Sequence, residues 1–179
     1  YLRADLVPYV REGIRVVVSP KKANIAIGRR AWMFVLSAVP AGIAGALAED
    51  WITKKLGTPA LIAISLMVFG VVLVWADRQT GTRDLDSFSM RDALLIGAAQ
   101  VLALNPGTSR SGITITAARK FGFSRDAAAR VSFLMSVPVI GGAVLLKMTK
   151  LASDGIPDGL LIPMIVGIIS AGISGWIAM

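Results

Sequence analysis

Cysteine and histidine are both absent from this chain of 179 residues. Without cysteine the chain can form no disulfide, no thiolate metal site and no cysteine nucleophile. Without histidine it lacks the commonest general base near neutral pH and the commonest metal ligand. Charged residues are also scarce, at 17% of the sequence. Any proton transfer would therefore depend on carboxylates, on water or on residues outside this chain.

Hydrophobic residues make up 55% of the sequence, and the mean hydropathy is +0.69. This composition excludes an ordinary soluble domain and predicts one all-α integral membrane domain, a polytopic helical bundle. The net charge of +8 comes from short segments between apolar runs. Membrane topology and anionic lipid headgroups explain such a pattern better than nucleic acid does. We therefore expect the membrane as a partner, and no nucleic acid.

Four apolar stretches approach the ~20 residues that cross the hydrocarbon layer of a membrane. The predicted spans are about residues 31–48, 59–76, 126–147 and 160–179. Residues 1–30 instead predict an amphipathic segment, which is broken at Ser19-Pro20 and followed by a basic turn. Prolines and glycines inside the spans favour a closely packed, kinked bundle. Because the chain begins at Tyr1 and ends in an apolar run, we expect a fragment of a longer membrane protein.

Residues 105–112, Asn-Pro-Gly-Thr-Ser-Arg-Ser-Gly, interrupt an apolar stretch that would otherwise resemble a further span. Pro106 is expected to end a first half-helix near Leu104, and Thr108 or Ser109 is expected to cap a second one. Non-helical backbone at membrane depth is tolerated only where it is buried in protein or lines a wet cavity. An arginine at that depth is costly and usually functional. The octapeptide is therefore the first candidate for a functional site.

The distribution of lysine and arginine predicts how this interrupted stretch lies in the membrane. Residues 1–30 carry seven basic residues and 119–130 carry four, whereas 49–58 and 147–159 carry two each. The positive-inside rule then favours a segment that enters and leaves on the cytoplasmic side. Each half of it, about 16–18 Å long as a helix, would reach only partway across the ~30 Å hydrocarbon layer. We therefore predict a re-entrant helix-loop-helix over about residues 92–118.

The octapeptide contains the donors that an anion needs. Arg110 has a planar guanidinium that matches phosphate oxygens. The N-terminus of the second half-helix would add free amides and the positive end of the helix dipole. The hydroxyls and the glycines that allow close backbone approach are Gly107, Thr108, Ser109, Ser111 and Gly112. Phosphate or diphosphate is the predicted ligand.

A plainer interpretation of the same residues is a helix-packing site, in which Arg110 snorkels or pairs with a carboxylate. For the neighbouring polar residues we favour this kind of role. Gln100 is expected to join helices, and Thr114 to bond to carbonyls of its own helix. Ser132 and Ser136 share one helical face and are expected to serve packing.

Three stretches match a known pattern, namely Leu104-Asn-Pro-Gly-Thr-Ser-Arg-Ser-Gly112, Ser124-Arg-Asp-Ala-Ala128 and Ser132-Phe-Leu-Met-Ser-Val-Pro138. Together they closely resemble the bacterial undecaprenyl-diphosphate phosphatase family, the bacitracin-resistance phosphatases. The resemblance covers essentially the whole chain. It implies an inverted-repeat fold in the bacterial inner membrane. It also implies a hydrolase that removes the terminal phosphate of undecaprenyl diphosphate, which recycles the lipid carrier for cell-wall peptidoglycan synthesis.

On this resemblance, Arg110 and Ser109 match the catalytic positions, and Gly107, Thr108, Ser111 and Gly112 match the surrounding phosphate-binding loop. The family's other signature, with paired acidic residues and a histidine, is absent from this chain. The general base and the ligands of any divalent metal ion are therefore expected outside it, and the chain alone is expected to be inactive. The alternative function is a polyprenyl-phosphate flippase or anion transporter with the same cradle. The sequence leaves open whether the protein forms a homo-oligomer.

Overall fold

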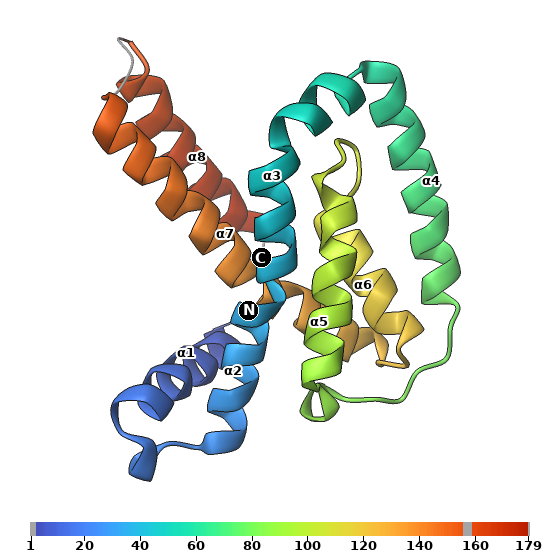
Figure 1. Ribbon diagram of the computed structural model, residues 1–179, viewed down its shortest axis with the longest axis vertical. Coiled ribbons are helices and arrows are strands. Elements are labelled where there is room, and N and C mark those ends of the chain that lie inside the picture. Colours follow the sequence, from blue (N-terminus) through green and yellow to red (C-terminus); the bar gives the residue numbers. More distant parts are fainter. Residues whose placement is uncertain (1–2, 156–158, 179) are drawn as a thin grey trace.

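The computed structural model describes residues 3–155 and 159–178, and this part of the chain is all α apart from one isolated β-bridge. The helices are α1 (Arg3–Val18), α2 (Ile25–Ser37), α3 (Val39–Leu56), α4 (Pro59–Asp77), α5 (Met90–Ala99), α6 (Arg110–Lys120), α7 (Arg125–Asp154) and α8 (Leu161–Ala178). Short 3-10 turns lie at η1 (Pro20–Lys22), η2 (Leu85–Ser87) and η3 (Gln100–Leu104). Figure 1 shows α5 and α6 between α3 and α4, with α1 and α2 at the lower end.

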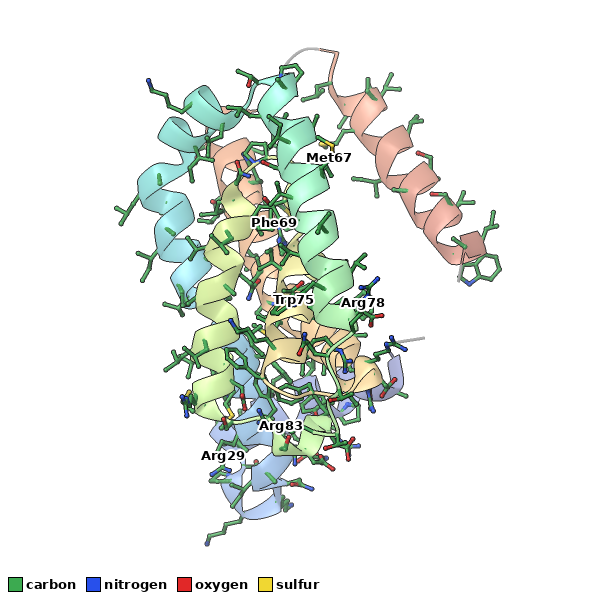
Figure 2. All side chains as sticks on the ribbon, turned by 90° about the vertical axis from the view of Figure 1, so that its right-hand side faces the viewer. Arg29, Met67, Phe69, Trp75, Arg78 and Arg83 are labelled. Atoms are coloured by element: carbon green, nitrogen blue, oxygen red, sulfur yellow. The ribbon has the colours of Figure 1, made fainter. Side chains whose placement is uncertain are left out.

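Four stretches of the described residues are long and apolar enough to cross a membrane. They are Ile25–Ala48, Pro59–Asp77, Arg125–Ser153 and Leu161–Ala178. The last of these, α8, has no buried residue and stands apart from the other helices in Figure 2. An apolar helix without a protein neighbour is stable only against hydrocarbon or another apolar surface. The protein is therefore an all-α, multi-pass membrane protein.

The helices differ from the predicted spans at their ends. Residues 49–58, predicted as a loop, are helical through Leu56, and only Gly57 and Thr58 separate α3 from α4. The expected span 31–48 is divided at Ala38, because Pro40 lies in the first turn of α3, where its missing N–H is tolerated. The basic turn predicted after Pro20 is shorter than expected, since α2 already begins at Ile25. Residues 1, 2 and 179 of the predicted segments lie outside the described part.

The core lies at the lower end of the molecule, where α1, α2, η2 and α7 meet the base of α5 and α6. A row of aromatic rings crosses it: Tyr9 packs edge-on against Phe34 at 5.4 Å, Phe34 lies 4.8 Å from Phe88, and Phe88 lies 6.2 Å from Phe123. Such pairs add about 0.5–1.5 kcal/mol each beyond the burial of their area. This apolar layer holds the base of the α5–α6 hairpin against its neighbours.

Arg83 ties the two ends of that hairpin together. Its guanidinium donates to both carboxylate oxygens of Asp92 at 3.0 and 2.7 Å and to the carbonyl of Phe121 at 2.9 Å. The same group stacks over the ring of Phe123, 4.1 Å from its centre, and Figure 2 shows Arg83 at the lower end of the molecule. Asp92 belongs to α5 and Phe121 follows α6, so a single side chain fixes the start of one helix against the end of the other.

Asp92 also closes a capping box at the start of α5. The Ser89 hydroxyl accepts from the Asp92 amide at 3.3 Å, and the Asp92 carboxylate accepts from the Ser89 amide at 2.9 Å. Burial alone would raise the pKa of Asp92, but the hydrogen bonds from Arg83 and Ser89 outweigh it and hold this pKa below its usual value. The carboxylate therefore stays ionised at the base of the hairpin.

Candidate functional site

The loop at the tip of the hairpin, residues 105–109, joins η3 to α6 between α3 and α4 (Figure 1), and it packs against α4. Asn105 organises it. Its Nδ2 donates to Ser65 Oγ of α4 at 2.8 Å and to Thr108 Oγ1 at 3.1 Å, and its carbonyl accepts from the Thr108 amide at 3.0 Å. Sequence reasoning assigned Asn105 no role, although asparagine before Pro-Gly is a residue that commonly sets a turn by side-chain hydrogen bonds.

Gly107 is required at this tip for two reasons. Its φ of +89° is one that residues with a side chain rarely adopt. A Cβ added there would lie 2.5 Å from the carbonyl oxygen of Ile62 in α4, which is closer than any real contact. Gly107 was expected to let the backbone approach a phosphate. In the structure, its close approach is to the backbone of α4.

Ser109 is the N-cap of α6, in agreement with the capping predicted from the sequence. Its Oγ accepts from the Gly112 amide at 3.1 Å, and its carbonyl accepts from the Ile113 amide at 2.9 Å. The two preceding amides, those of Arg110 and Ser111, are in the first helical turn, where no carbonyl of the same helix can accept from them. The Ser109 hydroxyl keeps its own proton to donate. The start of α6 thus presents three donors and the positive end of the helix dipole.

Arg110 lines a cavity of about 570 Å³ between α3, η3 and α7. Small residues make room for it, including Gly42 of α3 and Gly142 of α7, and Gln100 supplies a second polar side chain to the wall. Arg83 and Arg125 each bind a carboxylate. Among the side chains that the structure describes, which leave out those of residues 49–51, 53, 54, 150 and 154, none is a carboxylate within ion-pair distance of Arg110. The pairing of Arg110 with a carboxylate, the plainer interpretation of the sequence, stays a prediction.

The neighbouring polar residues have the structural roles that were favoured for them. Thr114 Oγ1 donates to the carbonyls of Arg110 and Ser111, both at 3.1 Å, and lies 2.6 Å from Ser132 Oγ. Ser132 thereby joins α7 to the first turn of α6. The buried Gln100 reaches the carbonyl of Ser37 at 3.5 Å and so links η3 to α2. These contacts fix the direction in which α6 begins.

The predicted site residues divide into two groups. Ser109, Arg110 and Ser111 are exposed at the start of α6. Thr108 is buried, with its hydroxyl bound inside the loop, and Gly107 faces α4. Gly112 is tightly packed, because a Cβ added to it would lie 3.1 Å from that of Ser109. The chemistry available to a ligand is therefore concentrated in the first turn of α6, and the rest of the loop supports that turn.

This donor set suits an anion. A guanidinium, two free amides and hydroxyl protons can surround several oxygens, as at other anion sites on helix N-termini. Among the side chains that the structure describes, no group of three acidic, histidine or cysteine residues could hold a metal ion. The guanidinium, amides and hydroxyls at the start of α6 are hydrogen-bond donors, and they do not fit a divalent cation.

Comparison with known proteins identifies the family. The family described as "Bacitracin resistance protein BacA" matches residues 1–179. The undecaprenyl-diphosphatase of Hahella chejuensis is 45% identical over 155 residues, which are 87% of this chain and 58% of that protein. That of Geobacter sulfurreducens is 44% identical over 182 residues, which cover 100% of this chain and 64% of that protein. The chain thus spans about three fifths of the length of these relatives, and the resemblance noted in the sequence is confirmed. The chain belongs to the BacA family of bacitracin resistance proteins.

Proposed function

We propose that this protein takes part in removing the terminal phosphate from undecaprenyl diphosphate in the bacterial inner membrane. Family membership and relatives that bear the name undecaprenyl-diphosphatase support this activity. The single structural observation that carries it is the position of Arg110. Its side chain lines a cavity between apolar helices at the start of α6.

In this proposal, Arg110 and the free amides of α6 bind the terminal phosphoryl group. Catalysis of phosphoryl transfer depends mainly on positioning and on stabilising the charge spread over the equatorial oxygens. A planar guanidinium and fixed amides suit both tasks. Ser109 orients the phosphate by donating its hydroxyl proton, since its oxygen already accepts from Gly112. The general base would lie in the part of the longer relatives that this chain does not match.

We also propose that residues 92–118 form a re-entrant hairpin in the membrane. The support is the contact between its two ends: the amide of Arg83, ahead of α5, donates to the carbonyl of Gly122, after α6, at 2.9 Å. Because the chain has no cysteine, single cysteines report topology directly. Thr82→Cys and Lys120→Cys should react with a membrane-impermeant maleimide from the same side, and Lys55→Cys from the other. Labelling of Thr82→Cys and Lys120→Cys from opposite sides would refute the hairpin.

The test of the activity is Arg110→Lys in the full-length protein. A lysine keeps the charge but cannot form two parallel hydrogen bonds with a phosphate. Release of inorganic phosphate should fall on the order of 10²-fold, as when one donor to a transition-state oxyanion is lost. Arg78→Lys, at the exposed end of α4 (Figure 2), is the matched control and should keep full activity.

Near-normal turnover of Arg110→Lys would refute the role of the arginine. Absence of any phosphate release from the unaltered full-length protein would instead favour the alternative, a polyprenyl-phosphate flippase or anion transporter that binds the same headgroup. The two outcomes are distinguishable in one assay, because only the second is seen without a mutation.

A further inference from the structure

We propose that a second, apolar cavity beside the Arg110 cavity holds part of the prenyl chain of the lipid diphosphate. This inference rests on the proposed function and names where the tail of that substrate would lie. The cavity has a volume of about 310 Å³ and is formed by α1, α2 and α7. Both it and the Arg110 cavity fall in the range of about 300–1,000 Å³ that is typical of ligand sites.

The lining of this cavity suits a hydrocarbon. Side chains such as Leu6, Val10 and Leu134 present only carbon atoms. Trp32 adds an indole whose one polar atom is already used, because its Nε1 donates to the carbonyl of Gly13 at 3.1 Å. Trp32 can therefore offer its ring to a ligand without leaving a polar group unpaired. Burial of apolar area from water or from a more polar region favours an apolar occupant here.

The position of the cavity argues for the tail of this particular lipid. Pro138 of α7 lines both cavities, and so joins the wall around Arg110 to the apolar one. The other shared wall is the α2–α3 corner, where Val35 lines the apolar cavity and Ala38, one turn later, lines the Arg110 cavity. A lipid with its phosphate at Arg110 could thus pass its chain along α7 without crossing a charged side chain of either wall.

The two cavities also differ in chemistry, and the difference matches the polar head and the apolar tail of the lipid. Arg110 and Gln100 are in the cavity that would take the headgroup, whereas the described walls of the second cavity carry no charged side chain. A polar head and an apolar tail of one molecule would therefore meet matching surfaces in adjacent spaces. Free inorganic phosphate would use only the first of them.

Photo-crosslinking tests the location independently of turnover. The probe is undecaprenyl phosphate with a diazirine on its third isoprene unit, applied to the full-length protein in membranes. Crosslinks should fall on peptides containing Trp32 and Leu134, and excess unlabelled undecaprenyl phosphate should suppress them. Crosslinks confined to the outer faces of α4 and α8, or unaffected by competitor, would overturn the tail site. Absence of phosphate release with these crosslinks intact would instead count against the proposed activity alone.

Substitutions that fill the apolar cavity test whether it helps the protein to select substrates by the length of their prenyl chain. Val35→Trp and Val137→Trp place an indole in the apolar cavity, and Val71→Trp, on the exposed face of α4, is the control. The two cavity variants should raise KM for undecaprenyl diphosphate several-fold and leave KM for geranyl diphosphate unchanged, because a chain of two isoprene units need not enter the second cavity. Equal changes for both substrates, or equal changes in the control, would refute the proposal.

Discussion

Replacing Gly107 with alanine should destabilise the protein through the tip of the hairpin. The φ of +89° would have to be kept by a residue with a Cβ, or the turn between η3 and α6 would have to change. Left-handed backbone costs an alanine roughly 1–2 kcal/mol. The added carbon would also lie 2.5 Å from the Ile62 carbonyl, which is main chain and cannot rotate away. Forcing extra volume into a packed site costs roughly 1–3 kcal/mol more.

The expected loss is therefore about 2–5 kcal/mol in the free energy of unfolding, measured by titration with a denaturing detergent in mixed micelles. Gly141→Ala is the matched control. An added Cβ at Gly141 meets nothing within 4 Å, and alanine favours helix over glycine by about 1 kcal/mol, so this variant should be as stable as the unaltered protein or more so. If Gly107→Ala lost no more stability than Gly141→Ala, the geometry assigned to the tip would be wrong.

Three further predictions concern contacts around the hairpin. Because the pKa of Asp92 is lowered in the folded protein, its carboxylate stabilises the fold above the unfolded pKa of about 3.9, and this stability is lost as the pH falls through the folded pKa. Acid should therefore destabilise the unaltered protein more steeply than Asp92→Asn, and parallel profiles of stability against pH would contradict this. Thr114→Val should cost about 1–3 kcal/mol, because the buried Ser132 hydroxyl would keep only its long contact of 3.5 Å with the Ser111 carbonyl. Thr114→Val with Ser132→Ala should cost less than the sum of the single changes, and an additive loss would show no coupling. Asn105→Ala should speed amide hydrogen exchange at residues 105–109, since the loop loses its bonds to α4, and unchanged exchange would refute the role of Asn105.

The helix break and its cap could be predicted because both depend on local chemistry. Proline has no amide to continue a helix, and serine at an N-cap satisfies an amide three residues later wherever the helix lies. The first half-helix accordingly ends at Leu104, and Ser109 caps the second. The proline and the serine also predict that hydrogen-bond donors gather at the start of α6. These two residues did not indicate which members of the octapeptide are exposed to a ligand and which support the loop.

What could not be predicted depends on partners distant in sequence. Nothing near Gly107 indicates that Ile62 lies against it, and nothing near Arg83 indicates that Asp92 and Phe121 would both bind its guanidinium. An arginine beside acidic residues in a loop, such as Arg83 in the segment between α4 and α5, is usually solvated. In the structure that loop is packed through its arginine against the base of the hairpin. The two cavities likewise exist only because α7 passes both α2 and α3.

Electrostatics supports the proposal that Arg110 binds the phosphate. A charge placed among apolar helices is costly unless an opposite charge offsets it. Nearer the surface, Arg125 pairs with Asp77 at 2.7 Å, and Arg130 pairs with Asp5. Arg110 lines a cavity between apolar helices, and the free amides and dipole of α6 add potential of the same sign. A diphosphate offsets all of these sources at once, and a single carboxylate would leave donors unused. In the proposed reaction, the same donors would already be in place when charge develops on the transferring phosphoryl group, so one arrangement would serve both binding of the anion and stabilisation of the transition state.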